Sequence, residues 1–244
     1  MHFRAGKNVS SKTVHCLLTA ADAIKQDDRP SEQAKVEDSD EADQHTSPTL
    51  SLSKSEMEEM ANSLRKELGV GVDAALDALS VRVYGVSVLV PHEVTNVTKQ
   101  CLLHLSGQGK SERSAMSVPL DTHNTRWAVL RNDAHQIERQ RVTYLEECWH
   151  ILLGHKLTRI AKVADSYGRT YDSSEEHDAF YLAAATLLPK AAIIKAIESE
   201  RGVKGIADQY GVSTGLVEYR IKRLGLWRRH KGISVELGKS PDSE

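Results

Sequence analysis

The feature that most constrains the fold is a pair of acidic residues followed by a histidine inside a predicted helix. From Gln136 to about Ala164 the apolar residues recur at helical spacing, and Glu146-Glu-Cys-Trp-His150 lies within this stretch. The pentapeptide differs by one substitution from H-E-x-x-H, in which two imidazoles one helical turn apart bind a metal ion beside a glutamate base. Glu146 stands at the position of the first imidazole.

Length and charge place the chain in a broad class. Its 244 residues allow one sizeable domain, or one domain with a small additional module. The formal net charge of −2 does not indicate that the molecule as a whole binds a polyanion, but the charge is unevenly distributed. Residues 27–43 contain eight acidic and two basic side chains, whereas residues 220–231 contain six basic and no acidic ones. This asymmetry indicates an acidic tail or linker and a basic contact surface.

The cysteines and the hydropathy pattern indicate a cytoplasmic protein. Cys16, Cys101 and Cys148 are few, odd in number and widely spaced, so we expect neither a disulfide framework nor a cysteine zinc site. No apolar run approaches the roughly 18–20 residues that cross a bilayer, which predicts no membrane partner. The short run of apolar residues near the N-terminus is interrupted by too many polar residues to be a secretion signal.

The chain divides into four predicted parts. Residues 1–52 are expected to be a disordered acidic segment, although a short helix over Ser11–Lys25 is an alternative for part of it. Residues 53–189 form the main domain, 190–232 a helical basic module and 233–244 a tail. Within the main domain the pattern predicts helices at 53–68 and 72–83, strands at 86–90, 115–120 and 126–130, and a helix at 174–188. Residues 97–105 fit either a helix or a strand.

The C-terminal module has the rhythm of a helix–turn–helix. A helix over 202–210 is followed by Gly211 and by a second helix over 213–224, with Ser213 as its N-cap. Phosphate contact would explain the basic residues Arg220, Lys222, Arg223, Arg228 and Arg229. The alternative is a packing module without a nucleic-acid role, which Gly215 and Glu218 in the second helix favour.

A third metal ligand has to come from outside the motif helix. Glu176 begins the next long helix and is the best candidate, with its neighbour His177 as a minor alternative. His155 would lie about 140° around a continuous helix from His150, so we expect it not to share an ion. Cys148 is expected to be a buried apolar residue, because no histidine is placed to activate it.

These residues resemble a known family. The run from Arg139 to His155, then Glu176-x-x-Ala179, then the apolar stretch ending at Pro189, is similar to the ImmA/IrrE family of bacterial and mobile-element metallo-endopeptidases. The resemblance runs from about Ser53 to Leu226. It implies an α+β, mainly helical, zincin-like metallopeptidase domain with a small sheet.

The resemblance also implies roles for individual residues. Glu147 corresponds to the general base, and the metal ligands correspond to Glu146, His150 and Glu176. The implied cofactor is Zn²⁺, or Mn²⁺ or Fe²⁺ because Glu146 makes the set rich in carboxylates. The implied partner is a protein substrate such as a transcriptional repressor.

Three departures from the family pattern leave an alternative function open. Glu146 replaces the first histidine ligand, Trp149 stands where the family usually has glycine, and Phe180 stands where it has asparagine. A missing ligand often accompanies lost activity. The alternative is therefore a catalytically degenerate peptidase fold that regulates by binding protein or DNA.

Overall fold

The structure is a computed structural model that describes residues 10–28, 52–155, 160–163, 166–169 and 173–232. Its contacts divide the chain into two compact units. The first comprises residues 1–54 and 77–183, and the second comprises residues 55–76 and 184–244. This division differs from the predicted boundaries at 53 and 189, because the helix after residue 53 belongs with the C-terminal helices.

A three-stranded sheet forms the centre of the first unit. The strands β1 (Val86–Leu89), β2 (Met116–Pro119) and β3 (Trp127–Leu130) lie in the order β1-β3-β2. β1 runs parallel to β3, and β2 pairs antiparallel with β3 through Met116↔Leu130 and Ser117↔Val129. All three predicted strands are confirmed. β2 is an edge strand, so one side of its backbone is available to groups other than strands.

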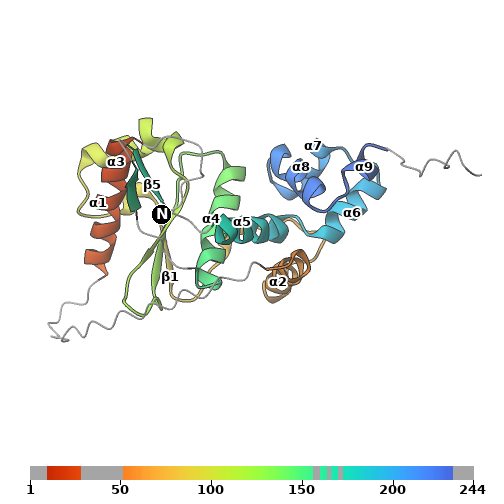
Figure 1. Ribbon diagram of the computed structural model, residues 1–244, viewed down its shortest axis with the longest axis horizontal. Helices are drawn as coiled ribbons and strands as arrows, with labels where there is room; N and C mark the ends of the chain where they lie inside the picture. Colours follow the sequence, from red (N-terminus) through yellow and green to blue (C-terminus); the bar gives the residue numbers. More distant parts are fainter. Residues whose placement is uncertain (1–9, 29–51, 156–159, 164–165, 170–172, 233–244) are drawn as a thin grey trace, which may run out of the picture. The chain divides into compact units, whose positions relative to one another are not determined.

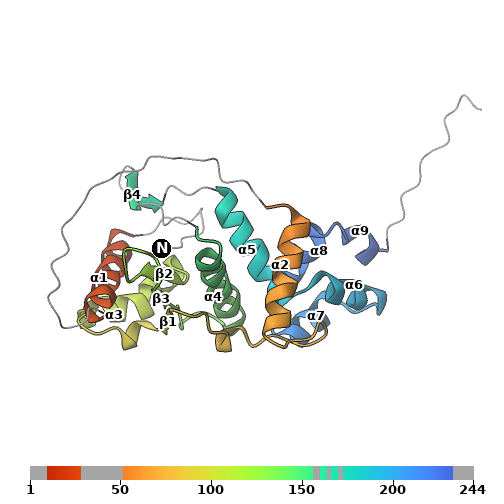
Figure 2. The same cartoon turned by 90° about the horizontal axis from the view of Figure 1, so that it is seen from below.

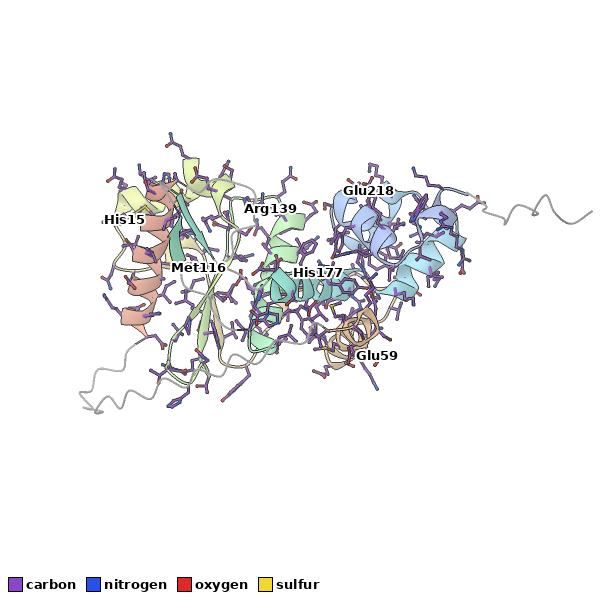
Figure 3. All side chains as sticks on the ribbon, in the orientation of Figure 1. His15, Glu59, Met116, Arg139, His177 and Glu218 are labelled. Atoms are coloured by element: carbon purple, nitrogen blue, oxygen red, sulfur yellow. A yellow bond between two sulfur atoms is a disulfide. The ribbon has the colours of Figure 1, made fainter. Side chains whose placement is uncertain are left out.

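Helices cover both faces of this sheet. The helices α1 (Ser11–Asp27) and α3 (Lys99–Ser106) lie on one face and α4 (Ile137–Leu152) lies on the other, as Figure 1 and Figure 2 show. The core between α1, α3 and the sheet contains Leu17, Leu105 and Leu130, together with Met116, which is labelled in Figure 3. Met116 and Val118 face this core because strand side chains alternate between faces.

The prediction of disorder for residues 1–52 is wrong over α1, and the alternative of a helix there is confirmed. Ser10 caps α1 by accepting a hydrogen bond from the Thr13 N–H, and the apolar face of the helix is buried. Residues 29–51 lie outside the described part of the chain. The expectation of no disulfide is also wrong, since Cys16 and Cys101 are bonded and join α1 to α3. The two cysteines are 85 positions apart, a separation at which sequence cannot identify a pair.

Two helix boundaries differ from the prediction. Residues 72–83 form turns and the short 3₁₀ helix η1 (Ala78–Ser80) rather than an α-helix. The reason is local, because the carbonyl oxygens of Gly71 and Ala74 accept hydrogen bonds from the buried Arg65 guanidinium. α4 ends at Leu152 instead of near Ala164, because Gly154 adopts a left-handed conformation with φ of 65°.

Further short elements complete the first unit. The 3₁₀ helices η2 (Pro91–Glu93) and η3 (Gln108–Glu112) flank α3. The segment 97–105, which fitted either a helix or a strand, is thus helical from Lys99 onward. After α4, the strands β4 (Ile160–Val163) and β5 (Ser166–Arg169) pair antiparallel, a hairpin that the sequence did not predict. The next helix, α5 (Ser173–Leu187), confirms the prediction and begins in the first unit.

Helices are the only regular secondary structure among the described residues of the second unit. It contains α2 (Lys54–Glu67), α6 (Lys190–Glu198), α7 (Val203–Tyr210), α8 (Thr214–Arg223) and α9 (Trp227–His230). Gly211, with φ of 60°, ends α7, and the Ser213 side chain caps α8 by accepting from the Leu216 N–H. The predicted pair of helices joined at Gly211 is confirmed.

No single helix among the described residues has the length and apolar character of a membrane span. The bent pair α5 and α6, which meet at 53°, meets the criterion of length and composition only together.

We predict that the native, unreduced protein has no thiol that reacts with an alkylating reagent at pH 8. Cys148 is 1% exposed, and its burial raises the pKa of the thiol to about 12, so the reactive thiolate is absent. Mass spectrometry should count no labelled thiol in the native protein, one after denaturation and three after denaturation with a reductant. Three labelled thiols without reductant would contradict the Cys16–Cys101 bond.

Candidate metal site and nucleic-acid surface

The buried face of the helix α4 includes most residues of the motif and fixes the helix in the first unit. Its seven consecutive residues from Thr143 to Trp149 are all buried. Tyr144 donates a hydrogen bond of 2.8 Å to the carbonyl oxygen of Val81, and burial raises the pKa of its hydroxyl well above the usual value. Tyr144 therefore stays a neutral donor and fixes the rotation of α4, which decides where the acidic residues point.

Glu147 is fixed by the edge of the sheet. Glu147 is 1% exposed, and its Oε2 accepts a hydrogen bond of 2.9 Å from the backbone N–H of Ser117 in β2. Oε1 is buried and has no hydrogen-bond partner. A buried carboxylate is costly unless it is hydrogen-bonded, so one oxygen is anchored while the other retains its capacity to accept a proton. Ser117 is a contact that the sequence analysis did not identify.

The structure brings His150 and Glu176 together. His150 Nε2 lies 3.6 Å from Glu176 Oε1, so the two residues from α4 and α5 face one another across the gap between their helices. Two ligands that each lie about 2.1 Å from a tetrahedral ion are about 3.4 Å apart. The separation and the chemistry of the imidazole and the carboxylate therefore fit a shared divalent ion.

Glu146 does not complete a third position beside this pair. The residue is 4% exposed and lies one helical turn before His150. Within the described ranges, no group of three histidine, cysteine, aspartate or glutamate side chains lies close enough to hold a metal ion. The predicted set of Glu146, His150 and Glu176 is thus present as a fitting pair, with Glu146 in the adjacent turn of the same helix.

His155 lies where the sequence analysis did not place it. The expected position, about 140° around the helix from His150, assumed that the helix continued. Instead the chain turns back at Gly154, and the His155 N–H donates a hydrogen bond of 3.0 Å to the His150 carbonyl. The two rings meet edge to face with 5.0 Å between centroids, and their Nδ1 atoms are 2.9 Å apart. A glycine shortly after a run of helical residues is the signal that could have predicted this turn.

The alternative ligand His177 lies beside the Tyr181 ring, with 6.2 Å between centroids.

The proposed nucleic-acid role of Arg220 is wrong. Its side chain is fully buried, pairs with both carboxylate oxygens of Glu58 at 2.8 and 3.0 Å, and donates from Nε to the Leu188 carbonyl at 2.9 Å. The guanidinium therefore joins α2, the end of α5 and α8 within the second unit and has no access to a phosphate. Sequence counting could not distinguish this buried cation from its exposed neighbours.

The remaining predicted basic residues lie at or near the surface. Lys222 and Arg228 are exposed, Arg223 lies 5.6 Å from the centre of the Tyr219 ring, and Arg229 forms an ion pair of 2.8 Å with Glu198. The exposed positions toward the N-terminus of α8 are Thr214, Gly215 and Glu218; Figure 3 labels the last. A recognition helix contacts base edges with this end, where an acidic side chain is repelled by phosphate.

The small sheet, its covering helices and the motif helix fit an α+β, metallopeptidase-type domain. A comparison with protein families is consistent with this class: residues 110–222 match the model of the IrrE N-terminal-like domain, Peptidase_M78. The match includes α4, α5 and the helices up to α8, and it confirms the resemblance to the ImmA/IrrE family. Peptidases of this family are generally metal-dependent. No curated protein and no solved structure matches the chain.

We predict that Arg220→Ala destabilises the second unit by about 3–5 kcal/mol. The substitution removes the partner of Glu58 and so leaves the Glu58 carboxylate of this ion pair uncompensated. Lys222→Ala is the matched control, because it removes an exposed cation two residues away and should change the unfolding free energy by less than about 0.5 kcal/mol. Chemical denaturation measures both. Equal stability of the two variants would contradict the structural role of Arg220.

Proposed function

We propose that this protein is a metal-dependent endopeptidase that acts on a regulatory protein, such as a transcriptional repressor. The observation that supports the proposal is the approach of His150 Nε2 to within 3.6 Å of Glu176 Oε1, next to a buried glutamate at the position of the family's general base. The family match over residues 110–222 supports the same class of chemistry.

Each residue has a defined part in the proposed reaction. His150 and Glu176 would hold the ion. Glu146 does not complete a group of three with them in this structure, but it lies one helical turn before His150 and would supply the third ligand if it turned toward the bound ion. A bound divalent ion supplies polarisation of the scissile carbonyl and a lowered pKa for water. Glu147 accepts the proton of the attacking water at Oε1, while the Ser117 N–H holds Oε2 in place.

Zinc peptidase sites usually have two histidine ligands. The carboxylate-rich ligand set proposed here favours a harder metal ion than such sites do. Three carboxylates, from Glu146, Glu147 and Glu176, and a divalent ion sum to a charge of about −1. Oxygen-rich sites suit manganese or iron better than sites rich in imidazole. We therefore propose that the resident ion is Mn²⁺ or Fe²⁺, with Zn²⁺ as the alternative.

A specific observation favours a second candidate. The described residues contain no assembled group of three ligands, and a catalytic zinc site needs three protein ligands. The second candidate is a catalytically degenerate peptidase fold that regulates by binding a protein partner. A DNA contact of this candidate would use Lys222, Arg223, Arg228 and Arg229, although Glu218 on the exposed face of α8 weakens it.

We predict that the purified protein binds about one divalent ion per chain after reconstitution with zinc or manganese. Glu176→Ala should abolish this binding, because it removes half of the pair that fits the ion. Glu146→His should raise zinc affinity, because it restores an imidazole at the adjacent helical turn. Elemental analysis after gel filtration measures all three, and absence of both metals from the unsubstituted protein would favour the second candidate.

We predict that Glu147→Gln lowers the rate of cleavage of the cognate repressor by at least about 10²-fold, because an amide cannot take the proton of water. The amide oxygen can still accept from the Ser117 N–H, so the folded state should be retained. Electrophoresis of the repressor after incubation, with and without a chelator, measures the rate. Cleavage by Glu147→Gln at the unsubstituted rate would remove Glu147 from the mechanism.

A further inference from the structure

The turn after α4 places a second imidazole directly behind the proposed ligand His150. His150 Nε2 faces Glu176, and His150 Nδ1 lies 2.9 Å from Nδ1 of His155. Two further contacts fix this arrangement: the backbone hydrogen bond from the His155 N–H to the His150 carbonyl, and the edge-to-face packing of the rings. The two nitrogens of His150 thus have different neighbours on the two sides of the ring.

The tautomer of His150 decides whether it can bind an ion. A neutral imidazole binds a metal through its unprotonated nitrogen, while the other nitrogen carries the proton and donates it to an outer partner. Such partners orient the ring and raise the basicity of the ligand nitrogen. His150 can bind an ion beside Glu176 only if Nδ1 carries the proton and has an acceptor.

We propose that His155 is the positioning residue of the metal site: its Nδ1 accepts the Nδ1 proton of His150 and so directs the Nε2 lone pair toward the ion shared with Glu176. The proposal rests on the proposed metal-dependent function. His155 does not touch the ion or the substrate, and it acts through His150.

The identity of the partner suits the charge of the site. The common outer partners of a metal-bound histidine are a carboxylate, a backbone carbonyl or water. Glu146, Glu147 and Glu176 already supply three carboxylates at this end of α4. A neutral imidazole can accept the proton of His150 without adding a fourth negative charge to the site.

The backbone at Gly154 delivers His155 to this position. Gly154 has φ of 65°, a conformation that residues with a side chain rarely adopt. A Cβ at this position would meet no atom within 4 Å, so any effect of a substitution comes from backbone strain rather than from collision. Asparagine tolerates the left-handed conformation, whereas β-branched valine does not. The chain therefore offers a pair of variants that move His155 without altering any side chain of the site.

The experiment measures Zn²⁺ and Mn²⁺ affinity of the full chain by competition with a chromophoric chelator. His155→Ala should weaken affinity by about 10–100-fold, the usual effect of removing an outer partner. His155→Asn should recover most of this loss, because its amide oxygen can accept the same proton. Gly154→Val should weaken affinity in the same direction as His155→Ala, and Gly154→Asn should stay near the unsubstituted value. Long-range proton–nitrogen correlation spectra of the zinc-loaded protein should show His150 protonated at Nδ1.

The outcomes separate this inference from the function on which it rests. Loss of binding in Glu176→Ala with unchanged affinity in His155→Ala would overturn the role of His155 and leave the metal site intact. Equal losses in His155→Ala and His155→Asn would show that the hydrogen bond is not the cause, and would also overturn the proposal. An unsubstituted protein that binds neither ion would overturn the proposed function and this inference together.

Discussion

The burial of two adjacent carboxylates in the middle of α4 is the constraint on which the rest of the site depends. Glu146 and Glu147 are 4% and 1% exposed, and an ionised carboxylate inside a protein is costly unless other groups compensate it. For Glu147, part of the compensation is the Ser117 N–H at the edge of the sheet, which is one reason that α4 packs on β2 in a fixed register. A bound divalent ion would compensate the remaining negative charge, so the electrostatics of the helix and the proposed chemistry have the same cause.

The second unit shows the same principle with the opposite sign of charge. Arg65 and Arg220 are 2% and 0% exposed, and both use their guanidinium groups to satisfy carbonyl oxygens at the ends and turns of helices. Arg220 adds a two-point ion pair with Glu58, a geometry that a lysine could not reproduce. These arginines fix how α2, the end of α5 and α8 pack within the unit, so part of the basic character of the C-terminal sequence is structural.

Periodicity and capping residues were sufficient to predict the elements that carry the site. The helices α4, α5, α7 and α8 and the three strands of the sheet were predicted because their apolar positions repeat at the period of the element. The end of α4 was not predicted, because the apolar pattern continues past Gly154 while the backbone does not. The absent helix at 72–83 depends on hydrogen bonds from the Arg65 side chain to nearby carbonyl oxygens, and the buried state of Arg220 depends on partners that are distant in sequence. Periodicity carries no information on either. The same limit applies to the Cys16–Cys101 bond, whereas Gly154 was a local signal for the turn that brings His155 to His150.

The proposed function requires one divalent ion between His150 and Glu176. The most direct measurement is anomalous X-ray diffraction from crystals soaked with zinc, recorded on both sides of the zinc absorption edge. One strong anomalous peak is expected about 2.1 Å from both His150 Nε2 and Glu176 Oε1, with the His155 ring behind His150 and not bound to the ion. A map without a peak at this position, or with the ion bound directly by His155, would contradict a metal site shared by His150 and Glu176.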